Sequence, residues 1–479
     1  MKVRYALITL GALLLCYTGY RAYTLSFTID EAFSYRLIVP MSTMQIISLD
    51  KVFSANNHLL NSLLMKLFSW VAGDSEFVLR LPNVIAHFFY LLFSYRMAMR
   101  SKRPVMIVLT FVLLTCNPFL LDYFSAARGY GLASAFALGA VYFLLKWMDG
   151  SEKRYLWNIF LLLSLSVLSN FSFIPFFIAM AVAVFVVSIS RTRRISFSLR
   201  ELIPAFIISA ILFVICFEPL RRLVKFHALY YGGRNGFFSD TLHSLASCTL
   251  YDKYDSSIPL YSLIGLTLAV VISALFFVMR KIISREFKWD RISVLLLLLL
   301  TPLLLSELQF YLLGTPFPID RTGLFYVFVW TLLLSALIEK WMGSESVNKI
   351  FSAMAMLLIS LSLFHFSYSM NSSSLLSWKY DSETKTIFSD IEQKRTPESL
   401  PSVTLGTTNF MTYSARYYKD RKHLDWLQIL NLDSLNGQRC DAYLLMDHDS
   451  AFMRINSCGL IKHYEYSNTF LVRGKVLIR

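Results

Sequence analysis

Stretches of about 20 mostly apolar residues recur along most of the chain, and a helix of that length can cross the hydrocarbon core of a bilayer. The stretch at 155–190 is too long for one crossing, and Pro175 near its middle disfavours an uninterrupted helix. We therefore interpret it as two spans joined by a tight turn at 170–173, and predict eleven transmembrane helices in all. The apolar stretches lie at 5–23, 78–98, 104–121, 129–147, 155–190, 201–218, 258–280, 292–312, 322–341 and 350–370.

Composition favours a membrane protein over a soluble enzyme. Only 16% of the 479 residues are charged, whereas an ordinary soluble domain carries about 25%. The net charge is +15, but the basic residues gather in alternate loops, as they do on the cytoplasmic side of membrane proteins. With the N-terminus inside, every inner loop is basic, so the charge indicates topology rather than nucleic-acid binding. Tyr20-Arg21-Ala22-Tyr23 is a poor cleavage site, so we expect the first span to stay uncleaved.

An odd number of spans places the tail, residues 371–479, on the outer side, together with long loops at 24–77 and 219–257. Patterns at 403–405, 442–446 and 469–472 predict short strands, and the pattern at 421–430 predicts a helix. The predicted fold class is an all-α polytopic membrane domain, residues 1–370, followed by a small extracytoplasmic α/β domain. Two tail cysteines could form a disulfide in an oxidising compartment. They are Cys440 and Cys458.

Ionisable residues at a membrane boundary are costly and are therefore candidates for function. Asp30 and Glu31 follow the first span, and adjacent carboxylates near an apolar surface can supply a general base or bind a divalent cation. The structural alternative is that Asp30 caps a helix beginning at Glu31. His58 and Arg80 are further candidates near the first outer loop. Their structural alternatives are hydrogen bonding for His58 and snorkelling to the interface for Arg80.

A second set of ionisable residues lies later in the chain. Asp122 and Arg128 fall in the turn between the third and fourth spans, and Asp320-Arg321 opens the tenth. The planar guanidinium of Arg128 can hold a phosphate through two hydrogen bonds, and an ion pair with Asp122 is the structural alternative. The predicted topology puts all of these groups on the outer face. Carboxylates and arginines at one water–lipid boundary predict a substrate that has both a phosphate and a lipid part.

In their order these residues resemble the GT-C superfamily. The resemblance rests on the acidic pair after the first span, the His of the first outer loop, Arg80-Leu81-Pro82, and the Ala-Arg-x-Tyr-x-Leu segment around Arg128, and it covers residues 1 to about 340. The nearest branch comprises the bacterial relatives of the protein O-mannosyltransferases and of the lipid A aminoarabinose transferase. The resemblance implies a membrane glycosyltransferase that takes a sugar from a polyprenyl-phosphate donor.

The resemblance also implies roles for single residues. Asp30 would be the general base, with Glu31 beside it, and Arg128 and Arg321 would hold the departing lipid phosphate. The remaining implied substrate-binding positions are His58, Arg80 and Asp122. Leu59 and Leu60 stand where the family has two prolines, and Ala126 stands where many relatives have Glu. The motifs identify no definite cofactor, and Glu31 and Asp122 are the candidates for an optional divalent cation site.

The implied partners are a polyprenyl-phosphate-linked sugar, membrane lipid, and an acceptor that is a glycan, a lipid or a protein. The uncleaved first span and the basic inner loops suit a bacterial inner membrane, with the tail in the periplasm. Two rival functions stay open. One is a transporter or flippase for a lipid-linked sugar, although such proteins often show repeated halves and this sequence has no evident repeat. The other is a non-catalytic protein of envelope assembly.

Overall fold

The computed structural model describes residues 2–150, 152–192, 199, 201–342, 345–393, 402–434, 439–455 and 458–474. The chain divides into two compact units. The helical unit comprises Met1–Gly19, Thr43–Leu64 and Arg80–Met370. The sheet unit comprises Tyr20–Ser42, Met65–Leu79 and Asn371–Arg479, so it joins the C-terminal tail to parts of the first loop and of the helices beside that loop.

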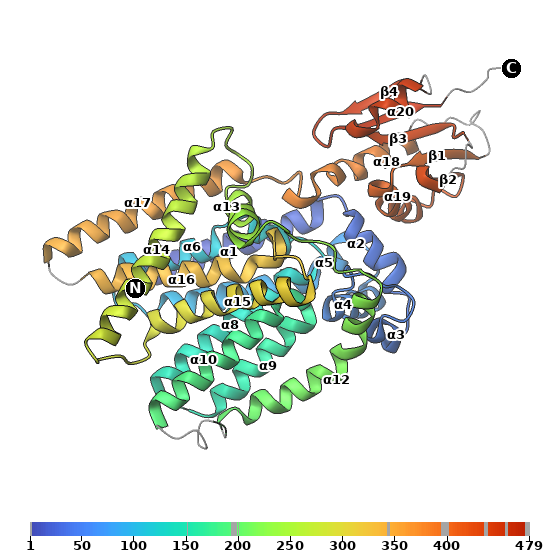
Figure 1. The fold of residues 1–479 in the computed structure, drawn as a ribbon. Coiled ribbons are helices and arrows are strands. Elements are labelled where there is room, and N and C mark those ends of the chain that lie inside the picture. Colours follow the sequence, from blue (N-terminus) through green and yellow to red (C-terminus); the bar gives the residue numbers. More distant parts are fainter. Residues whose placement is uncertain are drawn as a thin grey trace. The chain divides into compact units, whose positions relative to one another are not determined.

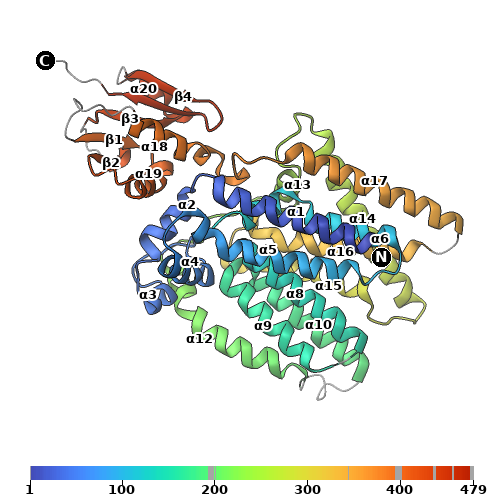
Figure 2. The same cartoon turned by 180° about the vertical axis from the view of Figure 1, so that it is seen from behind.

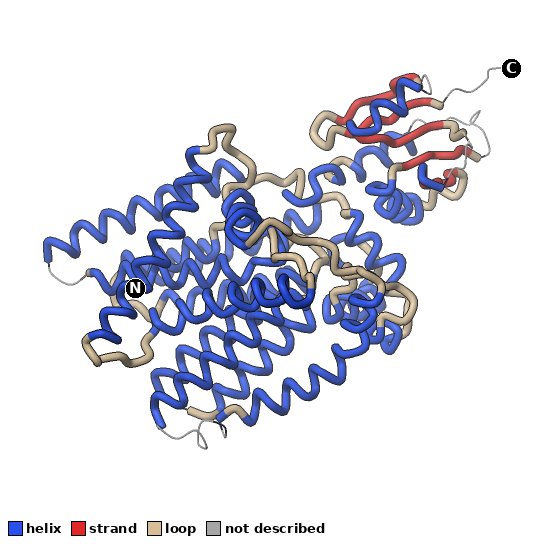
Figure 3. The backbone as a smooth tube through the Cα atoms, viewed as in Figure 1, coloured by secondary structure: helices blue, strands red, loops and turns tan. Residues whose placement is uncertain are grey.

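Helices make up most of the chain, and the strands drawn red in Figure 3 all lie in the tail. The helices before the tail, with short π- or 3₁₀-helices marked η, are α1 (Lys2–Thr24), α2 (Ile29–Phe33), η1 (Ser34–Ile38), α3 (Thr43–Ser48), α4 (Leu59–Ala72), α5 (Glu76–Ala98), α6 (Pro104–Thr115), α7 (Pro118–Phe124), α8 (Gly129–Gly150), α9 (Arg154–Ser169), η2 (Phe171–Phe173), α10 (Ile174–Thr192), α12 (Ile203–Lys225), η3 (Phe237–Leu242), α13 (His243–Thr249), α14 (Ile258–Ile283), α15 (Arg291–Leu313), η4 (Asp320–Gly323), α16 (Leu324–Trp341) and α17 (Glu345–Ser369).

The protein is an integral membrane protein. Within the described residues, nine helical segments are long and apolar enough to cross a membrane, and the bent pair α6–α7 makes a tenth. The eleventh predicted span corresponds to α9, a shorter apolar helix of 16 residues. The predicted turn at 170–173 is confirmed, because α9 ends at Ser169 and the Asn170 side chain accepts a hydrogen bond from the amide of Ser172.

Within the helical unit, α8 packs against α9, α10 against α15, and α6 against α17 (Figures 1 and 2). Gly139 of α8 illustrates how closely these helices approach. A Cβ atom at this position would lie 2.7 Å from the ring of Phe93 in α5. Small residues allow close packing of this kind between membrane helices.

The predicted span at 104–121 is broken rather than continuous. Helices α6 and α7 meet at an angle of 57°. Pro118 begins α7, and the Asn117 side chain caps it by accepting a hydrogen bond from the amide of Leu120. Proline at the first position and Asn at the cap both favour a new helix start. The break therefore follows from the local sequence.

The tail contains a five-stranded mixed sheet with the order β2-β1-β3-β5-β4. Strands β1, β2 and β3 are parallel, whereas β5 pairs antiparallel with β3 and β4. The three predicted strands are confirmed as β1, β3 and β5. The tail elements are η5 (Leu376–Asp381), α18 (Thr384–Gln393), β1 (Val403–Thr407), α19 (Asn409–Arg421), β2 (Leu427–Asn431), η6 (Leu432–Ser434), β3 (Ala442–Met446), η7 (Asp447–Asp449), α20 (Ser450–Ile455), β4 (Gly459–Tyr464) and β5 (Thr469–Arg473).

The predicted helix at 421–430 is wrong, because α19 ends at Arg421 and residues 427–431 form β2. Leu427 and Ile429 are both buried, and the strand pairs in register with β1. Tertiary pairing has therefore overridden the local pattern. Cys440 and Cys458 are free thiols that lie in or against one apolar cluster with Tyr443 and Val472, so they form no disulfide here.

Candidate functional site

The acidic pair lies at the start of α2 in the sheet unit, and α2 packs against α19. Thr28, rather than Asp30, is the cap of this helix. Its side chain accepts a hydrogen bond from the amide of Glu31, and the Glu31 carboxylate accepts one from the amide of Thr28 at 2.9 Å. This is a complete capping box. The proposed cap role of Asp30 is therefore wrong, and Glu31 has a structural role of its own.

Asp30 is half-buried, and its carboxylate accepts a hydrogen bond of 3.1 Å from the indole nitrogen of Trp378. A third carboxyl group, Asp381, is nearby and fully buried. Asp381 accepts hydrogen bonds from the amide of Ile29 at 2.8 Å and from the hydroxyl of Ser414 at 2.9 Å. Burial raises the pKa of Asp381 well above its usual value, and the charges of Asp30 and Glu31 raise it further. Burial and these neighbouring charges therefore favour the uncharged form of Asp381, whereas the hydrogen bonds from Ile29 and Ser414 favour the charged form.

A basic cluster lies in the helical unit, at the start of α8. The buried guanidinium of Arg128 donates hydrogen bonds to the backbone oxygen of Asn56 at 3.2 Å and to its side-chain oxygen at 2.6 Å. The same group lies 2.9 Å from Nε2 of His58. Asn61 donates to the carbonyl of Ala127 at 2.9 Å and accepts from Asn83, so this turn is held from two further helices.

His58 is a neutral imidazole in this environment. Its Nε2 faces the Arg128 guanidinium and its Nδ1 faces the amide of Gly129 at 3.1 Å. Both neighbours are hydrogen-bond donors, so a protonated ring, which carries two N–H groups, would leave both contacts repulsive. Burial lowers the pKa of His58 well below its usual value, and the charges of Arg128 and Arg321 lower it further.

Arg321, at the start of the α16 span, belongs to the same cluster. Its Nε donates to the hydroxyl of Tyr130 at 3.2 Å, and the ring of Tyr130 lies 4.8 Å from that of His58. The Arg321 guanidinium also lies 4.4 Å from the ring of Tyr231, whose hydroxyl donates to Asp320. Arg321 is half-buried whereas Arg128 is fully buried. A bound anion would therefore reach Arg321 with less rearrangement.

The two remaining predicted residues are both buried. Asp122 lies in α7 and accepts the hydroxyl of Tyr251 on both carboxylate oxygens at 3.0 Å. Arg80 in α5 is fully buried, so the snorkelling interpretation is wrong. Among the described residues no group of three or more His, Cys, Asp or Glu side chains could hold a metal ion. The two candidate cation ligands each have a hydrogen-bonding partner, because Glu31 closes a capping box and Asp122 bonds Tyr251.

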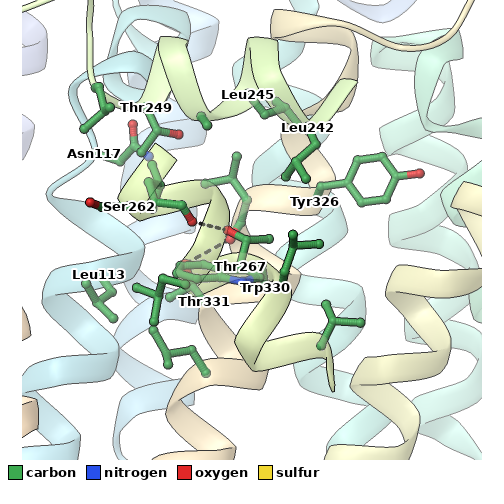
Figure 4. A pocket seen from close by; sticks show the side chains of 18 of the residues that line it. Leu113, Asn117, Leu242, Leu245, Thr249, Ser262, Thr267, Tyr326, Trp330 and Thr331 are labelled. Carbon is green, nitrogen blue, oxygen red and sulfur yellow. Dashed lines mark hydrogen bonds between the residues drawn. The ribbon is translucent and has the colours of Figure 1, made fainter. Parts of the chain in front are cut away.

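The helical unit also contains an apolar cavity of about 910 Å³ (Figure 4). It is lined by residues of α6, α13, α14, α15, α16 and α17, among them Leu245, Trp330 and Leu361. Three polar lining residues bond one another. Nε2 of His365 lies 2.9 Å from the carbonyl of Thr249, and Nδ1 of His365 lies 3.0 Å from the Tyr254 hydroxyl.

Helix α13 connects the cavity with the basic cluster. Leu245, Ala246 and Thr249 line the cavity. Two other residues of α13 instead bond Asp320, the neighbour of Arg321. The Ser244 hydroxyl accepts a hydrogen bond from the Asp320 amide, and the Cys248 thiol donates one to the Asp320 carboxylate. An apolar cavity and a cationic site therefore share one short helix.

Several residues of these clusters were not predicted as site residues. Asn56 precedes His58 by two positions, and Tyr130 follows Arg128 by two, so proximity to the motifs was a usable signal. Trp378 and Asp381 carried no such signal, because they are separated from Asp30 by hundreds of residues. Tyr231 likewise lies in a loop without a recognisable pattern.

No protein-family model and no curated protein matches this sequence. Solved structures do match. The structure of ArnT from Cupriavidus metallidurans in the apo state aligns with a TM-score of 0.53 and 10% identity, over 97% of each chain. The structure of the same protein bound to undecaprenyl phosphate aligns with a TM-score of 0.52 and 11% identity, again over 97% of each chain.

The described chain therefore has the fold of the ArnT structures. The similarity extends over nearly its full length, including the part of the chain that carries the tail domain. At this level of identity the likeness shows the fold alone.

Proposed function

We propose that this protein transfers a sugar from a polyprenyl-phosphate donor to an acceptor hydroxyl on the outer face of the membrane, with inversion at the anomeric carbon. The observation that carries the proposal is the basic cluster of Arg128, Arg321 and His58, together with the apolar cavity that shares α13 with it. A lipid phosphate needs a cationic site and an apolar path at once. ArnT, which has the same fold, has been solved bound to undecaprenyl phosphate.

In the proposed reaction the acceptor oxygen attacks the anomeric carbon as the bond from that carbon to the phosphate oxygen breaks. Asp30 takes the proton of the acceptor hydroxyl. Negative charge grows on the departing lipid phosphate, and the guanidinium groups of Arg321 and Arg128 stabilise that charge. Glu31 supports this arrangement by closing the cap of α2. No step is routed through a metal ion.

The remaining predicted residues shape the substrate site. Neutral His58 accepts a hydrogen bond and keeps the Arg128 guanidinium in place without adding a competing charge. Asp122 fixes Tyr251, next to α13, and Arg80 adds positive charge inside the helical unit. With the N-terminus in the cytoplasm, as the basic inner loops indicate, the tail lies in the periplasm of a bacterial inner membrane. The acceptor is a glycan, a lipid or a protein.

Mass spectrometry of cell-envelope glycans, with and without the protein, tests the proposal. We expect one sugar substituent to disappear without the protein and to stay absent when Asp30→Asn replaces the wild type. A flippase would lose the same sugar on deletion, but Asp30→Asn would restore it, because movement of the donor needs no proton acceptor. An envelope unchanged by deletion would contradict the proposal.

A further inference from the structure

We propose that Trp378 and Asp381, in the C-terminal tail, are positioning residues for Asp30. This inference rests on the proposed function, in which Asp30 is the general base. It gives the tail a part in the transfer step itself. All of the residues involved belong to the sheet unit, so the argument uses contacts within one compact body.

The side chain of Asp30 is held by Trp378. The indole is 2% exposed and its nitrogen donates to Oδ2 of Asp30 at 3.1 Å. An indole nitrogen can only donate, so this contact favours the ionised carboxylate over the protonated one. The large buried ring leaves Trp378 little freedom to move, which fixes the direction of the carboxylate.

The backbone beside Asp30 is held by Asp381. Oδ2 of Asp381 accepts the amide of Ile29, the residue before Asp30, at 2.8 Å. Trp378 and Asp381 both lie in η5, which is kinked at Trp378 (φ −135°, ψ 40°). One short segment therefore bonds both the side chain of Asp30 and the backbone amide of the residue before it.

Further contacts join the same stretch of chain to the tail. The Ser26 hydroxyl donates to the carbonyl of Ser382 at 2.7 Å, and the amide of Phe27 donates to the hydroxyl of Tyr418 at 2.7 Å. Residues 26, 27, 29 and 30 thus each bond to residues 378–418. A segment that only had to connect a span to α2 would not need this many long-range bonds.

The burial of Asp381 fits a positioning role. Its two carboxylate oxygens accept hydrogen bonds from the Ile29 amide and the Ser414 hydroxyl, and the side chain is buried. Asp381 is therefore fixed in place on both sides. Burial also raises its pKa, which weakens its repulsion of the Asp30 charge.

The first test follows the contact directly by NMR. The protein is labelled with ¹⁵N at tryptophan, and the Trp378 indole resonance is identified by its loss in Trp378→Phe. We expect this resonance to move in Asp30→Asn and to stay in place in the matched control Glu31→Gln, because Glu31 bonds the Thr28 amide instead. If the Trp378 indole resonance does not move in Asp30→Asn, the inference is overturned, whether or not the protein is a transferase.

The second test uses turnover of a radiolabelled polyprenyl-phosphate hexose by purified protein. Trp378→Phe keeps the ring and removes the donor, so we expect kcat to fall about tenfold or more with little change in KM for the donor. The acid limb of the kcat/KM profile should move to higher pH, because the ionised form of Asp30 has lost a hydrogen bond while Glu31 and Asp381 are unchanged. Trp426→Phe, a second tryptophan of the sheet unit, is the control.

Asp381 is tested by a matched pair. Asp381→Asn keeps an oxygen that can accept the Ile29 amide, so this variant should retain most of the wild-type kcat. Asp381→Ala removes that oxygen and should lose most of kcat, although the purified protein should be equally stable to heat. Unaltered kcat in both Trp378→Phe and Asp381→Ala, with an active wild type, would overturn the inference. A wild type without transfer would instead contradict the proposed function, and the NMR result would still decide whether Trp378 holds Asp30.

Discussion

The two candidate clusters of this protein are built in opposite ways. The basic cluster of Arg128, His58 and Arg321 belongs to the helical unit, where helices set the spacing and almost every group is buried. The acidic cluster around Asp30 and Asp381 belongs to the sheet unit, where a short loop is bonded to the tail.

This difference has a chemical meaning. The phosphate is anionic in the donor and gains further negative charge as it leaves, so a fixed set of cations on rigid helices can hold it throughout transfer. The position of the general base, by contrast, must suit the acceptor hydroxyl, and acceptors vary among glycosyltransferases. We therefore expect changes in the basic cluster to affect donor binding, and changes in the acidic cluster to affect turnover.

The largest expected effect is that of Asp30→Asn in the acidic cluster. Transfer should fall about 10²- to 10⁴-fold, as is usual when a general base is lost. Thermal stability should stay near that of the wild type, because Thr28 rather than Asp30 caps α2. Radiolabelled transfer and thermal unfolding of the purified variant measure both quantities. Near-normal transfer by Asp30→Asn, with an inactive Glu31→Gln, would show that Glu31 is the base.

Arg321→Gln and Arg128→Lys test the basic cluster. Each substitution should weaken the binding of undecaprenyl phosphate about 10- to 100-fold, because hydrogen bonds to a charged group usually contribute that much to affinity. Lysine lacks the planar fork with which Arg128 bonds Asn56 and His58. Binding is measured with purified protein in detergent. The control is Arg221→Gln, which removes an exposed arginine paired with Glu218. If all three variants bind undecaprenyl phosphate equally well, the basic cluster does not bind the lipid phosphate.

Gly129→Ala tests how rigid the basic cluster is. A Cβ atom at this position would lie 1.9 Å from the carbonyl oxygen of Ser169 and 2.6 Å from Nδ1 of His58. Overpacking of this kind costs about 1–3 kcal/mol of folding free energy. The thermal midpoint of Gly129→Ala should fall, whereas Gly150→Ala, at the open end of the same helix, should not change it. A normal midpoint for Gly129→Ala would mean that this turn can shift easily.

The smallest expected effects are on the pH dependence of stability, and they have opposite signs in the two clusters. The pKa of His58 is lowered in the folded state, so wild-type stability should fall as the pH drops below about 6.5, where only the unfolded chain takes up the proton. The pKa of Asp381 is raised, so its burial costs stability as the pH rises above about 3.9, where only the unfolded chain ionises.

Thermal midpoints measured across pH check both signs. His58→Gln should remove the acid-side loss and leave stability above pH 7 almost unchanged, whereas the exposed His227→Gln should have no such effect. Asp381→Asn should raise the midpoint at neutral pH, with a difference that shrinks toward acid pH. The reverse trend for either residue would contradict the direction of its pKa shift.

Much of the fold could be predicted because its signals are local. The apolar stretches, the turn at 170–173 and three of the strands depend on neighbouring residues, so their patterns were readable. The prediction failed where distant contacts decide. Residues 427–431 form a strand because they pair with β1. The predicted span at 104–121 breaks at Asn117 and Pro118. These two residues favour a new helix start, but the apolar residues around them led us to predict one continuous span.

The candidate site divides in the same way. The sequence by itself determined which residues are unusual, since Asp30, His58, Arg128 and Arg321 stand out as ionisable groups beside apolar stretches. Only the tertiary structure decided their partners. Arg321 meets Tyr130 across 191 positions of the chain, and Trp378 meets Asp30 across 348. Hydrogen bonds depend on distances in space, and folding alone brings such residues together.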